Sequence, residues 1–174
     1  MRRDQLEHAI RAACQIIHQC EVIVVGSQAI LGTRDESQLP AAATMSTEVD
    51  ILPMAETNDE TARLADLIQG VAGDGVDLET TILPDGWRDR LVKVQNANTA
   101  APSGEPRFTG WCLDKEDLCV AKLNAFSEKD RNFVAALLKA NLVDAGLIAS
   151  RLTTIPSRHV AATEHALTWL DSIR

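Results

Sequence analysis

Two stretches of the sequence decide the fold: VIVVGSQAILG at residues 22–32 and TMSTEVDILPM at residues 44–54. The first begins as a run of β-branched residues, which is typical of a strand buried on both faces, and then reaches a Gly-Ser turn. The second has the composition of an apolar strand, yet it contains two carboxylates, Glu48 and Asp50. We therefore expect a buried strand, a turn, a short helix and an acidic strand, in that order along the chain.

The acidic strand, predicted over residues 47–53, has two different faces because side chains alternate along a strand. The face expected to pack inward carries Thr47, Val49 and Ile51. The opposite face carries Glu48, Asp50 and Leu52, so the two carboxylates would lie roughly 6–7 Å apart at Cα. Like charges this close repel each other, so a cation is expected between them, and Mg²⁺ is the usual one where carboxylates also meet phosphates.

The Gly-Ser turn indicates what such a metal site would serve. Gly26 allows an anion to approach the backbone closely, and the Ser27 hydroxyl can donate a hydrogen bond to a phosphate oxygen. The start of the following helix adds free N–H groups. The combination predicts a triphosphate between Ser27 and the two carboxylates. Each piece alone is more typical of an ordinary turn or of an edge strand facing water, whereas their combination in this order along the chain favours the nucleotide site.

The remaining pattern predicts the fold class. Helices are expected at 4–19 and 58–69, and strands at 76–83, after Trp87 and at 107–113. From Lys115 onward the pattern is helical throughout, with helices at 115–128, 129–141, 143–152 and 156–173. We expect an α/β (α+β) fold, in which a mixed sheet of four or five strands is flanked by helices. Residues 1–114 would form this core, and residues 115–174 a helical region packed on it.

Composition excludes several classes of protein. The net charge of −8 argues against a protein that binds nucleic acid by neutralising phosphates. The four cysteines form no C-x-x-C pair and are expected to be reduced thiols in the core. The start of the sequence does not resemble a signal peptide, and no apolar run reaches membrane-spanning length. We expect a soluble, cytoplasmic protein without a membrane partner.

Four segments in this order resemble the nucleotidyltransferase superfamily: GSQAILG (26–32), EVD (48–50), TTILPDGWRDRL (80–91) and KLNAFSEKD (122–130). The helical stretch 117–138 is similar to the AbiEii-type toxin nucleotidyltransferases. The chain most resembles an uncharacterised bacterial group within the superfamily, a domain of unknown function, over about residues 20–150.

The resemblance implies roles for individual residues. Those implied in nucleotide binding are Gly26, Ser27, Lys122, Lys129 and Asp130. The carboxylates implied in catalysis and in holding Mg²⁺ are Glu48 and Asp50. A third carboxylate, serving as metal ligand or base, would be Asp77 or Glu79, and the sequence does not decide between them.

The implied activity is Mg²⁺-dependent transfer of a nucleoside monophosphate from an NTP to a hydroxyl on RNA, protein or a small molecule. A toxin-like role opposed by an antitoxin protein follows from the resemblance alone. One alternative is a non-catalytic nucleotide-binding or interaction module with the same fold, and another is a small-molecule adenylyltransferase. Trp87, Arg88 and Arg90 would either cover the sheet edge beside solvated arginines or contact the second substrate.

Overall fold

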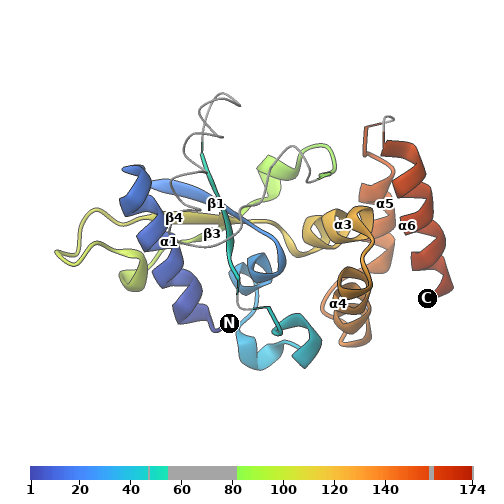
Figure 1. Cartoon of the computed structure of the whole chain (residues 1–174), viewed down its shortest axis with the longest axis horizontal. Coiled ribbons are helices and arrows are strands. Elements are labelled where there is room, and N and C mark those ends of the chain that lie inside the picture. Colours follow the sequence, from blue (N-terminus) through green and yellow to red (C-terminus); the bar gives the residue numbers. More distant parts are fainter. Residues whose placement is uncertain (47, 55–81, 157–158, 174) are drawn as a thin grey trace.

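The structure is a computed structural model that describes residues 1–46, 48–54, 82–156 and 159–173 (Figure 1). The predicted helix at 58–69 and residues 76–81 of the predicted strand at 76–83 lie outside the described residues, whereas residues 82–83 are described and are not in a strand. Asp77 and Glu79, the two candidates for a third carboxylate, therefore lie outside them as well.

The described residues form one mixed sheet of four strands in the order β2-β1-β4-β3. The strands are β1 (Glu21–Val25), β2 (Asp50–Pro53), β3 (Val92–Val94) and β4 (Thr109–Cys112). β1 runs parallel to β4 and antiparallel to β2, and β3 is antiparallel to β4. Four of the five residues of β1 are buried, as its β-branched run predicts for a central strand. The mixed sheet confirms the predicted fold class.

Helix α1 (Arg3–Ile17) packs against the sheet and is amphipathic. Its buried residues recur at helical spacing, and they include Leu6, Ile10, Ala13, Cys14 and Ile17. At the point of closest approach β4 carries Gly110, where a Cβ atom would lie 2.3 Å from Cδ1 of Ile10. The missing side chain at Gly110 lets the helix lie directly on the strand.

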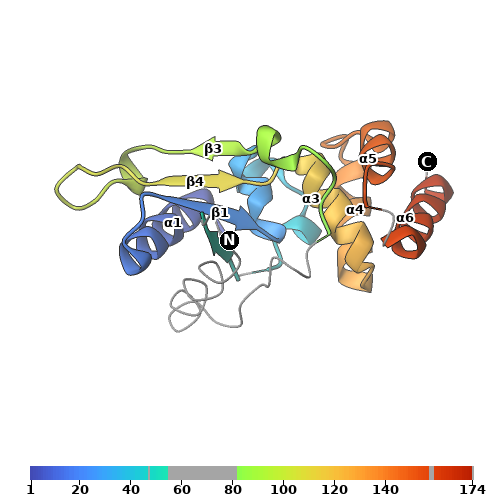
Figure 2. The ribbon, with the colours of Figure 1, turned by 90° about the horizontal axis from the view of Figure 1, so that it is seen from above.

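The C-terminal half is helical, as predicted, and lies beyond one end of the sheet (Figures 1 and 2). Its helices are α3 (Lys115–Ala125), α4 (Glu128–Lys139), α5 (Ala145–Leu152) and α6 (Val160–Ser172). Helix α3 is central, since it contacts each of the other three, and it follows β4 almost directly. Buried side chains of α3 join the same hydrophobic core as those of the sheet.

Helix α3 is fixed to its surroundings by a buried carboxylate in its first turn. The Asp117 side chain is fully buried and accepts hydrogen bonds from Arg90 Nε at 2.8 Å and from Arg90 Nη2 at 3.1 Å. Arg151 Nη1, from α5, donates to the same carboxylate at 3.0 Å. Arg90 is therefore a partly exposed member of an ion pair with the core, whereas Arg88 lies over the Trp87 ring at 4.8 Å.

The structure corrects the prediction for the acidic strand. β2 begins only at Asp50, because β1 ends at Val25, the residue that pairs with Asp50. Glu48 is exposed and precedes the strand. Leu52, which was assigned to the outward face, is 1% exposed and pairs with the buried Ile23, whereas Val49 and Ile51 are partly buried and pack against the core as predicted.

The four cysteines are free thiols, and three of them lie in the core as expected. Cys14, Cys112 and Cys119 are buried free thiols, whereas Cys20 is exposed and is not part of the core. Burial raises the pKa of the Cys14 and Cys112 thiols to about 12, so these groups are poor nucleophiles. Within the described ranges, no helix combines the length and apolar character needed to span a membrane.

Replacing Arg90 with Ala is expected to destabilise the fold by about 3 kcal/mol, because it leaves the fully buried Asp117 with one cation instead of two. Arg88→Ala is the matched control, since it removes an exposed arginine that lies over the Trp87 ring and should cost less than about 1 kcal/mol. Urea denaturation of both variants measures the difference. Equal losses would show that the Asp117 ion pairs do not stabilise the fold.

Candidate functional site

The Gly-Ser turn and the acidic strand meet at the sheet edge. Gly26 follows the last residue of β1 and has a φ of 67°, a conformation that favours glycine. A Cβ atom at this position would lie 1.8 Å from Oδ2 of Asp50. Asp50 therefore lies directly against the glycine backbone, and any side chain at residue 26 would displace its carboxylate.

Ser27 begins a 3₁₀ helix that runs to Gly32. A strong N-terminal dipole requires an α-helix, and this 3₁₀ helix is shorter and tighter than one. In addition, the Ala29 N–H already donates a hydrogen bond to the Gly26 carbonyl. The helix dipole expected from the sequence thus contributes little. Neutralisation of an anion beside Ser27 must come mainly from side chains.

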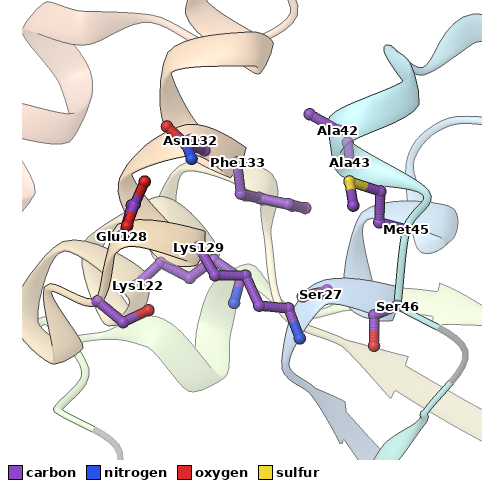
Figure 3. A pocket seen from close by; sticks show the side chains of 11 residues that line it. Ser27, Ala42, Ala43, Met45, Ser46, Lys122, Glu128, Lys129, Asn132 and Phe133 are labelled. Atoms are coloured by element: carbon purple, nitrogen blue, oxygen red, sulfur yellow. The ribbon is translucent and has the colours of Figure 1, made fainter.

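Two lysines supply that charge from the helical half. Ser27, Lys122 of α3 and Lys129 of α4 line one cavity of about 540 Å³. This volume lies within the range typical of small-ligand sites. Figure 3 shows Lys129 reaching from α4 toward Ser27. Three of the residues implied by the resemblance, separated by up to about a hundred positions in the sequence, thus share one cavity.

Lys122 is held in place by Asp130. Its Nζ donates to Asp130 Oδ1 at 2.8 Å and lies 5.2 Å from the centre of the Phe133 ring. The Ser127 hydroxyl donates to the other oxygen of Asp130 at 2.6 Å. Burial by itself raises the pKa of Asp130, but the hydrogen bonds from Lys122 and Ser127 outweigh this effect, and the net pKa lies below the usual value. Asp130 is thus an ionised carboxylate that orients the lysine.

Lys129 differs from Lys122 because its ammonium forms no ion pair within the described part of the chain. It is exposed and lies near enough to Asp50 to lower the pKa of that carboxyl. Its charge therefore remains available to an anion entering the cavity.

Several opposing effects act on the pKa of the Asp50 carboxyl. Burial raises its pKa, the positive charge of Lys122 lowers it, Glu48 raises it and Lys129 lowers it, and the net pKa is raised. A divalent cation would offset the cost of burying this charge. The Asp50 side chain touches the turn that precedes Ser27, and Glu48 lies two residues before it.

The residues present fit Mg²⁺, which usually binds one or two carboxylates together with waters and substrate phosphates. Glu48 and Asp50 are the two carboxylates that the sequence indicated for this role. Neither is among the described residues that line the cavity, and the carboxylate in that lining is Glu128. The ranges that the structure describes contain no group of three or more His, Cys, Asp or Glu side chains that could hold a metal by themselves.

Sequence reasoning missed one wall of the cavity and part of another. The wall opposite the helices comes from the segment between the Gly-Ser turn and β2, which contains the 3₁₀ helix Ala41–Ala43 and continues to Ser46. The buried Gln28 fixes this segment by donating from Nε2 to the Ser46 carbonyl at 2.5 Å. Asn132 and Phe133, from the second turn of α4, complete the lining. The spacing of four residues between Lys129 and Phe133 on one helix is the only sequence signal that could have placed Phe133 in the cavity.

The sequence matches the model of one protein family. A family model described as "Nucleotidyltransferase of unknown function (DUF6036)" matches residues 4–167, which is nearly the whole chain. No curated protein and no solved structure matches the chain.

Replacing Gly26 with Ala is expected to destabilise the protein by more than the roughly 1–2 kcal/mol that a left-handed backbone costs an L-residue, because the new Cβ overlaps Asp50. Gly104→Ala is the matched control, since Gly104 also has a positive φ but has no atom within 4 Å of its added Cβ. Chemical denaturation gives both free energies of unfolding. Equal losses in the two variants would contradict the contact between residue 26 and Asp50.

Proposed function

The chain belongs to this family of nucleotidyltransferases of unknown function, and we propose that its cavity binds an NTP and that it transfers a nucleoside monophosphate from that NTP to a hydroxyl acceptor. The observation that carries the proposal is the position of Ser27, Lys122 and Lys129 around one cavity, with Asp50 against the preceding glycine. A hydroxyl, two cations and a carboxylate are the groups that a metal-bound triphosphate requires.

Each group has a distinct role in this proposal. Lys122 and Lys129 neutralise phosphate oxygens as point charges, and the Ser27 hydroxyl donates a hydrogen bond to one of them. Asp130 is a positioning residue, because its ion pair holds the Lys122 ammonium at 2.8 Å. These contacts hold the triphosphate at a defined place in the cavity, and this positioning contributes directly to the rate of a displacement.

Glu48 and Asp50 are the residues that would hold Mg²⁺, and a bound Mg²⁺ supplies charge neutralisation at the phosphates during transfer. In the reaction the acceptor oxygen forms a bond to the α-phosphorus, and the bond from that phosphorus to the bridging oxygen breaks. Pyrophosphate leaves, and the acceptor hydroxyl loses its proton to a base. Asp77 and Glu79 remain the proposed sources of a third carboxylate.

The acceptor in this proposal is a hydroxyl on RNA, protein or a small molecule. The net charge of −8 is unfavourable for a large RNA and compatible with a cationic small molecule. A toxin-like role opposed by an antitoxin protein remains part of the proposal and rests on the resemblance to the AbiEii-type enzymes.

A second candidate function is nucleotide binding without transfer. It is favoured by the position of Glu48, which is exposed and lies outside β2, so that only Asp50 of the two carboxylates is held rigidly by the sheet. A loosely held ligand fits poorly with the near-octahedral geometry that Mg²⁺ demands.

Asp50→Asn is expected to reduce transfer by about 100-fold or more, because metal-assisted charge stabilisation contributes several kcal/mol. The assay incubates the protein with labelled NTPs, Mg²⁺ and either total tRNA or cell extract, and measures label incorporated into acceptor. Asp89→Asn, at an exposed position beside Trp87, is the matched control and should keep full activity. Equal labelling by wild type and Asp50→Asn would disprove the catalytic assignment.

Lys122→Ala is expected to weaken NTP binding by about tenfold, which corresponds to loss of one charge-assisted contact. Isothermal titration with ATP and GTP, with and without Mg²⁺, measures the change. Lys139→Ala, at the exposed end of α4, controls for general loss of positive charge. Binding by wild type without turnover would favour the non-catalytic module, and absence of binding would contradict both functions.

A further inference from the structure

Ser127 carries a hydroxyl group to which the proposed transfer gives no chemical role. It is the residue that precedes α4, it is exposed, and it lines the same cavity as Lys122 and Lys129. A serine hydroxyl is a weak nucleophile by itself and becomes an effective one when a neighbouring base takes its proton. Such a base must lie within hydrogen-bond distance of the oxygen.

A carboxylate lies within that distance. Ser127 Oγ donates a hydrogen bond of 2.6 Å to Asp130 Oδ2, and the other oxygen of this carboxylate accepts from Lys122 Nζ at 2.8 Å. The three side chains are thus arranged as a nucleophile, a base and a group that orients the base. Because the hydrogen bonds keep the pKa of Asp130 below its usual value, the carboxylate is ionised and can accept a proton.

Ser127 also has an ordinary structural role. Its Oγ accepts a hydrogen bond from the Asp130 N–H at 3.1 Å and so caps the N-terminus of α4. A hydroxyl oxygen has two lone pairs, and the cap uses only one of them. The second lone pair remains for a bond to an electrophile in the cavity, so capping and nucleophilic attack by the same oxygen are compatible.

We propose that Ser127 is an acceptor of the reaction and that the chain transfers a nucleoside monophosphate from the bound NTP to its own Ser127 hydroxyl. This inference rests on the proposed function, because it requires an NTP whose phosphates lie beside Lys122 and Lys129. It names one acceptor, a protein hydroxyl inside the cavity itself.

In this step Ser127 Oγ forms a bond to the α-phosphorus of the NTP, and the hydroxyl proton passes to Asp130 Oδ2. The bond from the α-phosphorus to the bridging oxygen breaks, and pyrophosphate leaves with the electron pair of that bond. The product is a phosphodiester that joins Ser127 to the nucleoside, and Asp130 releases its proton to water. Because the new group occupies the cavity, each chain should accept a single nucleotide and then bind no further NTP.

The test incubates wild type with Mg²⁺ and each of the four ribonucleoside triphosphates, labelled at the α-phosphate, without another acceptor. Label that stays on the denatured protein is measured and located by mass spectrometry. We expect it on Ser127, at no more than one nucleotide per chain. The fraction labelled per unit time should not depend on protein concentration, because the cavity and the hydroxyl belong to one chain. The γ-phosphate leaves in pyrophosphate, so label at that position should not be retained.

Substitutions at Ser127 separate the hydroxyl from the cap. Threonine and asparagine both cap helices, but only threonine keeps a hydroxyl, so Ser127→Thr should retain labelling and Ser127→Asn should abolish it. Asp130→Asn should lower the labelling rate by about 100-fold or more, the usual contribution of a general base. Ser103→Ala is the matched control, since it removes an exposed hydroxyl that donates to the Glu105 carbonyl outside the cavity lining. It should label like wild type.

The outcomes separate this inference from the proposed function. Transfer to tRNA or cell extract by wild type, without label on Ser127, would overturn this inference and leave the proposed function intact. Label that persists in Ser127→Asn, or that comes from the γ-phosphate, would also overturn it. Isothermal titration of wild type with the same four nucleotides and Mg²⁺ completes the test, because absence of binding would overturn the proposed function itself.

Discussion

The contact between Asp50 and Gly26 is the constraint on which the rest of the site depends. Antiparallel pairing places Asp50 beside the last residue of β1, and the turn that follows has no Cβ to obstruct its carboxylate. Ser27 comes next in the chain, so the Asp50 carboxylate lies against the residue that precedes the Ser27 hydroxyl. A change in strand register by one residue would turn Asp50 to the opposite face and separate the two groups.

The cationic half of the site depends on a second set of contacts. Arg90 and Arg151 bind the fully buried Asp117 and hold the start of α3 near the end of β4. Lys122 lies farther along the same helix, and Asp130 of α4 fixes its ammonium. The position of a lysine in the cavity therefore depends on charge pairs that begin in the core, which explains why the segment containing Arg90 is polar although it contacts no part of the cavity.

Much of the fold could be predicted from local pattern. The β-branched run of β1, the periodicity of α1 and the four C-terminal helices were all predicted, because each signal involves neighbours two to four positions apart. The acidic strand was predicted too long, and Leu52, which was assigned to its outward face, is buried. The first residue of β2 is set by where β1 ends, and the burial of Leu52 is set by its pairing with Ile23. Neither is encoded within residues 47–53.

For the site, the sequence by itself indicated the residue types: a glycine and a serine after a strand, paired carboxylates, and lysines in the later helices. Only the tertiary structure decided that Ser27, Lys122 and Lys129 line one cavity, that Asp130 orients a lysine, and that Ala43, Met45 and Asn132 belong to the same lining. The physical reason is that a side chain's chemistry is a property of one position. Its partners depend on strand register and helix packing, which bring together residues about a hundred positions apart in the chain.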